Sequence, residues 1–335
     1  MNDQKSLGIL IVGLGMGSKR ARGLKDARGA HLAAVCDMNA ERLTKARDEF
    51  GCAAYADLDQ ALADPGVHCV HVMTPTGFHL DVARKAAAAG KHVIVTKPLE
   101  KNAARARELI PTCEEAGVLL GADFELRFNP LYRRVKAALD SGTLGDLLAI
   151  DARCKWFRRQ EYFFHPRGTW AGDGGGAITI QGIHLIDLII WLAGMPTEVW
   201  ADTLTQDHDI EVEDWGFALM RFANPRVRAT TTCTTTYAKD LEFGIDLHGT
   251  RGAVNTVRGF YDPVPSTGEW YFRPGCEVEL PDPGDHPLSA AEDMARAVQS
   301  GTKPECNGHE GLKSMLLIDA IYRSSREGRS VQIDV

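Results

Sequence analysis

The sequence lacks the features that mark exported, membrane-spanning or metal-binding proteins. Near its N-terminus it has one short apolar run, Leu7–Val12, which is too short for a signal peptide or a membrane span. Its eight cysteines are scattered, with no CxxC pair and no spacing typical of metal ligands. We therefore expect reduced cysteines, a cytoplasmic location and no bound metal.

Basic residues are also in deficit. The 38 lysines and arginines are outnumbered by 45 acidic residues, which gives a formal net charge of −7. This balance argues against a general nucleic-acid binder and against a protein of anionic membrane surfaces. A chain of 335 residues is long for a single core, so we expect two domains.

Strand and helix patterns alternate over residues 1–123. Short apolar segments are followed by helical segments, several of which end at a glycine. Such alternation predicts an α/β domain with a doubly wound parallel sheet, and the glycine-rich first turn indicates a dinucleotide-binding Rossmann domain. The expected strands are Leu7–Val12, His31–Cys36, Ala53–Tyr55, Val67–Val72, Val93–Val95 and Val118–Ala122, and the first expected helix is Met16–Arg28.

The pattern changes over residues 124–335. Strand-like segments follow one another without helices between them, which predicts a substrate-binding α+β domain with a large, mostly antiparallel open sheet. One segment, Val227–Tyr237, is β-branched on both faces, and a sheet with helices on one face must cover the other. We therefore expect a homodimer or homotetramer built on that sheet face. The other expected strands are Leu147–Phe157, Val199–Leu204, Trp215–Phe222, Leu241–His248 and Ala253–Val257.

Gly13-x-Gly15 follows a strand and opens a helix, as a dinucleotide-binding turn does. Its glycines would let the backbone approach the pyrophosphate of the cofactor. Asp37 ends the second strand, where an acid binds the ribose hydroxyls and repels a 2′-phosphate, so NAD is favoured. Alternatively, Asp37 only caps the next helix, and Arg42 keeps NADP possible. The other candidates for cofactor binding are Met16, Gly17, Thr74, Pro75, His79 and Lys97.

Lys97 ends the strand Val93–Val95 and precedes Pro98. Ligands of open parallel sheets bind outside the carboxyl ends of the strands, which is where Lys97 is expected. Pro98 removes a backbone donor and biases Lys97 towards an extended conformation. An amine that loses solvation in such a crevice has its pKa lowered and can exchange a proton near neutral pH. The alternative is a strand-end lysine that reaches solvent.

A glycine run, Gly174–Gly176, leads into an apolar helix with few polar residues. Gln181, His184 and Asp187 are spaced by three and share one face, and Ile180 precedes His184 by one turn. His184 is therefore a candidate for catalysis, and Ile180 and Gln181 are candidates for substrate contact. The alternative is a core histidine whose partner is Asp187. Because no second histidine or cysteine lies at metal-ligand spacing, we expect no metal here.

Residues 155–170 form an aromatic and basic segment inside an acidic protein. Aromatic faces stack on sugars or bases, and arginines bind phosphate or carboxylate through paired hydrogen bonds. Lys155, Arg158, Arg167 and Trp170 are therefore candidates for substrate binding, and so is Arg127. The alternative is a packed connector with a solvated charged edge.

These motifs together resemble the glucose–fructose oxidoreductase / inositol dehydrogenase / MocA (Gfo/Idh/MocA) family over nearly the whole chain. The resemblance implies NAD(P)-dependent hydride transfer at a hydroxyl-bearing carbon of a sugar, sugar nucleotide or cyclitol. It implies Lys97 as the proton-transfer residue and His184 as a partner of the substrate hydroxyl or a relay. The matching motifs are Gly13-x-Gly15, Asp37, Thr74-Pro75, Gly90-Lys91-His92-Val93, Lys97-Pro98, Arg127-Phe128-Asn129-Pro130, Gly182-x-His184-x-x-Asp187, Val212-Glu213-Asp214 and Tyr322-x-Ser324-Ser325-Arg326.

Residues 155–170 are similar to the branch of this family that acts on nucleotide-linked amino sugars or their uronates, which implies an anionic substrate. Two positions depart from the family pattern. Thr96 replaces the glutamate of the usual Glu-Lys-Pro, and Ile180 stands where family dehydrogenases commonly carry Asp or Asn. Two other functions therefore stay open: an NAD-using glycoside-cleaving or epimerising enzyme of the same family, and a non-catalytic dinucleotide-binding regulator.

Overall fold

The computed structural model describes residues 6–258 and 268–334. The chain divides into two compact units. The first comprises Met1–Glu125 and Pro287–Leu312, and the second comprises Leu126–His286 and Lys313–Val335. The segment Pro287–Leu312 thus returns to the first unit, whereas the sequence pattern places it with the second domain. None of the described helices combines the length and hydrophobicity that a membrane span needs.

The first unit is built on a parallel sheet. Its strands are β1 Leu7–Val12, β2 Ala30–Cys36, β3 Ala53–Tyr55, β4 Cys69–Val72, β5 His92–Thr96 and β6 Leu120–Asp123. They lie in the order β3-β2-β1-β4-β5-β6, which confirms the predicted doubly wound sheet. Ile9, Val70 and Ile94 are fully buried, as expected of strands covered on both faces.

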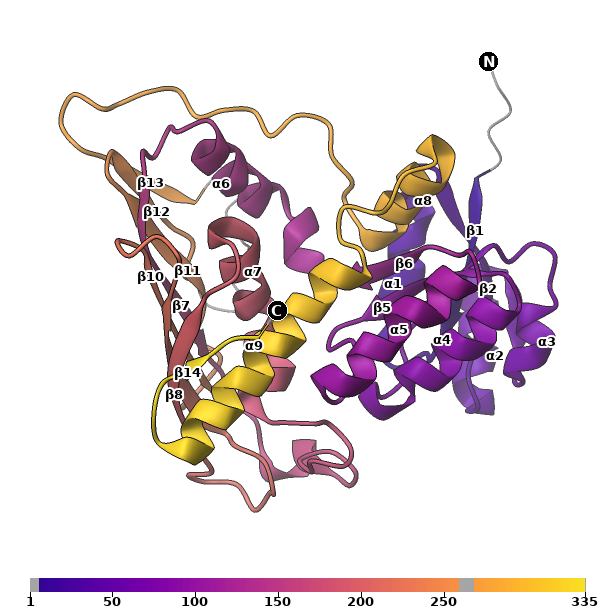
Figure 1. Cartoon of the computed structure of the whole chain (residues 1–335). Coiled ribbons are helices and arrows are strands. Elements are labelled where there is room, and N and C mark those ends of the chain that lie inside the picture. The colour runs from indigo at the N-terminus through magenta and orange to yellow at the C-terminus, as the bar shows by residue number, and fades with distance from the viewer. Residues whose placement is uncertain (1–5, 259–267, 335) are drawn as a thin grey trace. The chain divides into compact units, whose positions relative to one another are not determined.

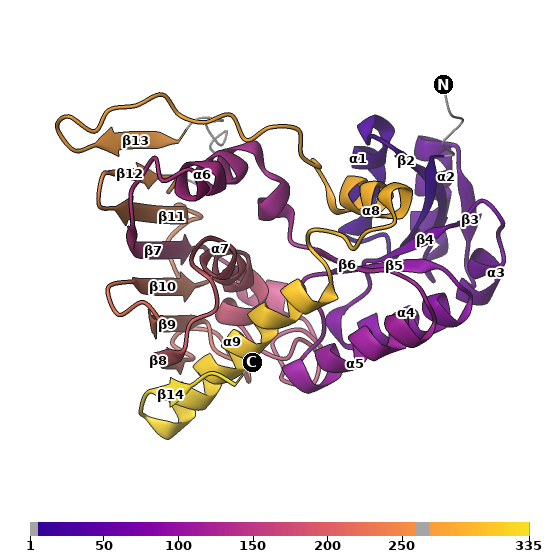
Figure 2. The same ribbon diagram turned by 45° about the horizontal axis from the view of Figure 1, so that its top comes forward.

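Helices lie on both faces of this sheet. Figure 2 shows α4 His79–Ala88 and α5 Ala103–Glu115 on one face and α8 Ala290–Ser300 on the other. The remaining helices are α1 Gly17–Gly23, α2 Ala40–Phe50 and α3 Leu58–Leu62. The side chains of Asn39, Asp57 and Asn102 cap α2, α3 and α5 by accepting a backbone N–H of the first turn.

The second unit is built on an eight-stranded sheet with the order β13-β12-β11-β7-β10-β9-β8-β14. The pair β7–β10 is parallel and the other pairs are antiparallel, which confirms the predicted mostly antiparallel sheet. Three helices, α6, α7 and α9, lie on one face of it (Figures 1 and 2). The bounds are β7 Leu147–Lys155, β8 Glu198–Leu204, β9 Trp215–Arg221, β10 Arg228–Thr234, β11 Glu242–Gly249, β12 Gly252–Asn255, β13 Glu269–Phe272, β14 Val331–Gln332, α6 Pro130–Asp140, α7 Ile183–Ala193 and α9 Gly308–Glu327.

Several elements differ from the sequence expectation. The helix expected over Met16–Arg28 ends at Gly23 and continues as one 3-10 turn, Leu24–Asp26. Strands β13 and β14, at the two edges of the second sheet, are not predicted, because the alternating pattern is weak in such short segments. A π-helix, Ile178–Gly182, precedes α7. Because of this π-helix, the regular α-helix begins only at Ile183, after the residues that a simple α-helix would have included.

Candidate functional site

The turn between β1 and α1 is packed tightly against the end of β4. Gly13 has a φ of +96°, and a Cβ there would lie 2.7 Å from the carbonyl oxygen of Met73. A Cβ at Gly17 would lie 2.8 Å from a side chain of β1. Both positions therefore require glycine. Around Gly15 the space is open and Met16 beside it is exposed, so this part of the turn is accessible to a ligand.

Asp37 connects the end of β2 to this glycine turn. Its carboxylate accepts the backbone N–H of Leu14 at 2.6 Å and that of Asn39 at 2.8 Å. A guanidinium nitrogen of Arg42 lies 3.7 Å from the carboxylate. The residue that caps α2 is Asn39, so capping does not account for Asp37. The carboxylate is instead oriented beside the turn that the sequence assigns to the cofactor.

His79 bridges the ends of β4 and β5. Its Nε2 lies 2.9 Å from the carbonyl oxygen of Thr74, and its Nδ1 lies 3.0 Å from that of Pro98. Burial lowers the pKa of His79, although these carbonyls and Glu100 oppose the shift. The imidazole ring therefore holds the loop after β4 and the loop after β5 together. The Thr74 hydroxyl is buried with no hydrogen-bond partner in the described residues, which fits a polar group of a bound cofactor.

Lys97 follows β5 at the carboxyl end of the parallel sheet. Its side chain is half-buried, and its peptide bond to Pro98 is cis. The loop after it is fixed by Glu100, which is fully buried. The Glu100 carboxylate accepts the backbone N–H groups of Leu80 and Lys101 and pairs with Arg105 Nε at 3.0 Å. Lys97 therefore lies between the strand β5 and a loop that the hydrogen bonds of Glu100 hold in place.

Asp123, at the end of β6, is a polar residue of this region that the sequence does not single out. Arg20 Nε donates to its Oδ2 at 2.6 Å, and His71 Nε2 lies 3.1 Å from the same oxygen. Although burial opposes ionisation, Arg20 and His71 hold the pKa of Asp123 well below its usual range. The signal that identifies Asp123 is an acid directly after an apolar strand. This cluster ties α1 to β4 and β6.

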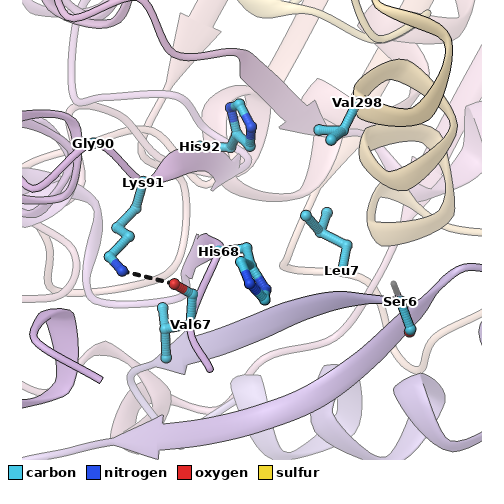
Figure 3. A pocket seen from close by; sticks show the side chains of 8 residues that line it. All are labelled: Ser6, Leu7, Val67, His68, Gly90, Lys91, His92 and Val298. Atoms are coloured by element: carbon cyan, nitrogen blue, oxygen red, sulfur yellow. Dashed lines mark hydrogen bonds between the residues drawn. The ribbon is translucent and has the colours of Figure 1, made fainter. Parts of the chain in front are cut away.

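A cavity of about 280 Å³ lies at the opposite, amino-terminal edge of the same sheet (Figure 3). Its two imidazoles satisfy the first backbone groups of neighbouring strands. His68 Nδ1 accepts the N–H of Gly8 and His92 Nδ1 accepts that of Leu119, each at 3.0 Å. Lys91 Nζ donates to the carbonyl of Val67 at 2.7 Å, as the dashed line shows. These groups hold strand starts together and lie on the edge away from Lys97.

In the second unit, the glycine run leads through the π-helix Ile178–Gly182 into α7. Ile180 is half-buried, whereas Gln181 and His184 are largely buried. The Gln181 amide donates to the Tyr162 hydroxyl at 3.5 Å, which brings the π-helix to the aromatic segment. Short π-helices are frequent at functional sites. No group of three or more His, Cys, Asp or Glu in residues 6–258 and 268–334 is placed to hold a metal ion.

Glu213, just before β9, holds the start of this helical segment. Its carboxylate accepts the N–H groups of Gly176 and Ile178, each at 2.9 Å, and its carbonyl oxygen accepts that of Ala177 at 2.9 Å. The Tyr322 hydroxyl donates to the same carboxylate at 2.9 Å. Burial raises the pKa of Glu213 to about 7, although these hydrogen bonds oppose the shift. In the sequence, Glu213 stands out only as part of the motif Val212-Glu213-Asp214, and the sequence predicts no function for it.

Three of the predicted substrate cations are paired with carboxylates of this chain. Arg127 forms a buried ion pair with Asp187. Lys155 Nζ lies 2.9 Å from a carboxylate oxygen of Glu242. Arg158 is likewise paired, with Asp240 at 3.0 Å, and its guanidinium lies 4.9 Å from the Trp156 ring centroid. Their charges are therefore largely neutralised within the second unit.

Arg167 differs from these three. Its guanidinium carbon lies 4.6 Å from the ring centroid of Tyr162 and 5.6 Å from that of Phe164. Within the described part of the chain, this guanidinium forms no ion pair and donates no hydrogen bond. Trp170 nearby in sequence is 44% exposed and meets the Tyr322 ring edge-on at 5.1 Å. The segment thus presents one accessible indole and one stacked arginine whose charge interacts with Asp173 without a direct ion pair.

Comparison with known proteins covers both units. Residues 7–124 match the oxidoreductase family described as an NAD-binding Rossmann fold, and residues 132–255 match the GFO/IDH/MocA C-terminal domain. The WlbA dehydrogenase of Bordetella pertussis, solved in complex with NADH and UDP-GlcNAcA, is 30% identical with a TM-score of 0.84, covering 99% of this chain and 100% of that one. The D-xylose 1-dehydrogenase (NADP(+)) 2 of Haloferax volcanii is 29% identical over 96% of this chain and 97% of its own. The myo-inositol 2-dehydrogenase of Thermotoga maritima is 27% identical over 97% and 98%.

These similarities confirm the family, the fold class and the nicotinamide cofactor that the sequence predicts. They also confirm the predicted class of reaction, since the named relatives are dehydrogenases of a sugar and a cyclitol. The open space at Gly15, the oriented Asp37 carboxylate and the unpartnered Thr74 hydroxyl are chemically compatible with a bound dinucleotide. The chain therefore belongs to the Gfo/Idh/MocA family and is an NAD(P)-dependent oxidoreductase.

Proposed function

We propose that this enzyme oxidises a hydroxyl-bearing carbon of an anionic sugar, with a nucleotide-linked acetamido sugar or its uronate as the substrate class. The observation that carries the proposal is Arg167, whose guanidinium is stacked on Tyr162 and forms no direct ion pair within the described residues, although the Asp173 carboxylate interacts with its charge. Such a guanidinium is oriented to donate paired hydrogen bonds to a carboxylate or phosphate. The similar WlbA dehydrogenase, which has UDP-GlcNAcA bound, supports this substrate class.

Lys97 acts as the proton-transfer residue, and His184 orients the reacting hydroxyl. In oxidation, the Lys97 amine would take the hydroxyl proton, and the nicotinamide, when bound, would supply the acceptor for the hydride from the same carbon. The alcohol carbon becomes a carbonyl, and reduction runs these steps in reverse. Ile180, Gln181 and Trp170 contact other parts of the sugar. The strand-end position of Lys97 and the π-helix before His184 support these roles.

The cofactor is NAD. The oriented carboxylate of Asp37 would bind ribose hydroxyls and repel a 2′-phosphate. The open space at Gly15 and the unpartnered Thr74 hydroxyl support binding along this edge of the sheet. The cofactor site is made by Gly13, Gly15, Met16, Gly17, Asp37, Thr74, Pro75 and Lys97, with His79 acting through the loops that it joins.

The enzyme assembles as a homodimer or homotetramer in the cytoplasm. All eight cysteines are free, which suits a reducing compartment. On the sheet face opposite the helices, Trp200 and Leu204 are each 41% exposed, and the Trp200 ring lies 6.2 Å from that of Phe217. Exposed aromatic clusters of this kind favour association. Light scattering at micromolar concentration should give a multiple of the monomer mass that falls in Trp200→Glu, and a monomeric native protein would contradict the proposal.

Absorbance of NADH tests the substrate class. We expect turnover with UDP-GlcNAcA and little with D-xylose or myo-inositol. Arg167→Gln should raise KM for the anionic sugar by about 10²-fold, because a hydrogen bond to a charged group contributes about 1.5–3 kcal/mol. Arg159→Gln is the matched control, since Arg159 is an exposed arginine of the same segment. An unchanged KM in Arg167→Gln would overturn the anionic substrate, and product without net NADH would indicate the epimerising or glycoside-cleaving reaction instead.

A further inference from the structure

Three consecutive backbone N–H groups at the start of the segment that bears His184 all donate to one residue. Gly176 and Ile178 donate to the Glu213 carboxylate and Ala177 to its carbonyl oxygen, each at 2.9 Å. The first N–H groups of a helix have no partner within it, so they must be satisfied from outside. Glu213 supplies all three acceptors, and it lies two residues before the start of the strand β9.

This contact explains two of the three glycines of the run, Gly175 and Gly176. A Cβ on Gly176 would lie 1.7 Å from the Glu213 carbonyl oxygen. A Cβ on Gly175 would lie 2.2 Å from both the Thr179 and the Tyr322 hydroxyl oxygens. These approaches leave no room for any side chain. The glycines therefore serve the close approach of the backbone to Glu213 and Tyr322.

Tyr322, on α9, extends the contact to the π-helix. Its hydroxyl donates to the Glu213 carboxylate at 2.9 Å and lies 2.7 Å from the Thr179 hydroxyl. Because the single Tyr322 proton is used by the carboxylate, Thr179 donates to Tyr322. Trp170, in the aromatic segment, meets the ring of Tyr322 edge-on. One acid and one phenol thus connect the glycine run, the π-helix, α9 and the aromatic segment.

Stability alone does not account for an acid at this place. Glu213 is 4% exposed, and its hydrogen-bond donors are neutral amides and a phenol. Desolvation of a carboxylate without a cation is costly, and burial accordingly raises the pKa of Glu213 to about 7. The carboxylate instead fixes the geometry of this region, because its two oxygens bind two backbone amides and the Tyr322 hydroxyl at the same time.

We propose that Glu213, supported by Tyr322, is a positioning residue for the reaction, because it sets the place of the turn that carries Ile180, Gln181 and His184. This inference rests on the proposed contact of those three residues with the substrate. Glu213 itself acts through the backbone of residues 176–178 and through Tyr322.

Glu213→Gln tests the proposal, because the amide keeps the size of the side chain but turns an NH₂ group towards one of the donors. We expect the amides of residues 176–178 to exchange hydrogen about 10-fold faster, the result of losing one hydrogen bond of about 1–1.5 kcal/mol. We expect kcat/KM for the sugar to fall by 10- to 100-fold, with NAD affinity unchanged. Tyr322→Phe, which removes only a hydroxyl, should give a weaker form of both effects and tests the same point if Glu213→Gln fails to fold.

Glu292→Gln is the matched control. Glu292 is a buried acid of the first unit that accepts the N–H of Leu288 at 3.1 Å and pairs with Arg28 at 3.0 Å. Its replacement should change neither exchange at residues 176–178 nor kcat/KM. Unchanged exchange in Glu213→Gln would overturn the inference, and so would faster exchange with unchanged kcat/KM. A native enzyme inactive on every sugar would refute the proposed function by itself, independently of the exchange result.

Discussion

The guanidinium of Arg127 donates to both carboxylate oxygens of Asp187, with Nε to Oδ2 and Nη2 to Oδ1 each at 2.8 Å. The two side chains are 3% and 1% exposed, and the Ser314 hydroxyl adds a third hydrogen bond to Asp187 at 3.2 Å. The pair joins the segment before α6 to α7. The sequence predicts Arg127 as a substrate ligand and offers Asp187 as a partner of His184. In the structure, the two residues bind each other and join elements within the second unit.

Arg127→Met should destabilise the protein, because it leaves the Asp187 carboxylate buried without its cation. Removing one partner of a buried pair typically costs about 3–5 kcal/mol. Urea unfolding measures the loss, and Arg127→Met combined with Asp187→Leu should recover much of it. If Arg127→Met instead raises KM for the sugar at unchanged stability, Arg127 is a substrate ligand as the sequence predicts.

Asp37→Ser should weaken the preference for NAD. The carboxylate that accepts the Leu14 and Asn39 N–H groups would no longer repel a 2′-phosphate, while Arg42 would remain to attract one. Titrations of intrinsic tryptophan fluorescence with NAD and NADP measure both affinities. Tighter binding of NADP than of NAD by the native protein would show that Asp37 does not select the cofactor.

Lys97→Met should leave NAD affinity near normal and reduce turnover by about 10²–10⁴-fold, the usual contribution of a positioned proton-transfer group. Lys91→Met is the control, because Lys91 belongs to the same sequence motif but donates to the Val67 carbonyl at the other edge of the sheet. It should retain turnover. Full turnover in Lys97→Met would make Lys97 an ordinary strand-end lysine.

The sequence predicts the parallel sheet well, because its central strands β1, β4 and β5 are buried, mostly apolar runs followed within three residues by glycine or proline. It also predicts the acid at the end of β2 and the glycine turn, since both depend on local spacing. Spacing alone could not reveal the partners of Arg127 or the bridging position of His79. These depend on contacts between residues far apart in the chain, such as Arg127 with Asp187.

Glu213 shows the same limit. Its neighbours Gly176 and Tyr322 come from segments that no local pattern connects to it. The glycine run alone fits a phosphate loop, a turn or a close backbone approach equally well. The sequence before His184 also does not predict the π-helix. A π-helix adds one residue to a helical turn, and the segment stays apolar with or without it.

The buried carboxyl of Glu213 should make stability depend on pH. Its pKa is raised to about 7 from an ordinary value of 4.5, so the folded protein binds this proton more tightly than the unfolded chain. The resulting contribution is fully present below about pH 4.5 and is lost as the pH rises through about 7. The free energy of unfolding of the native protein, relative to Glu213→Gln, should fall by about 3 kcal/mol over that range. A difference that stays constant with pH in urea unfolding would contradict this.

Ile180 should set the preference of the enzyme among sugars. It is half-buried on the π-helix, and it stands where family dehydrogenases commonly carry Asp or Asn. An isoleucine makes this wall of the site apolar, which suits an acetamido methyl or a deoxy carbon better than a hydroxyl. A site without a hydrogen-bond partner gains little from an added hydroxyl, whereas a site built with one strongly rejects its absence. We therefore expect native protein to oxidise simple polyols such as myo-inositol poorly.

Ile180→Asp should increase kcat/KM for myo-inositol relative to UDP-GlcNAcA by about 10-fold or more, because the new carboxylate can accept a hydrogen bond from the polyol. Ile180→Val keeps the wall apolar and should leave the ratio unchanged, so it separates polarity from size. NADH absorbance with the two substrates gives both ratios. If native protein oxidises myo-inositol with ordinary efficiency, the apolar wall does not select the substrate. Gln181, whose amide donates to the Tyr162 hydroxyl, or Asp187 would then supply the polar contact.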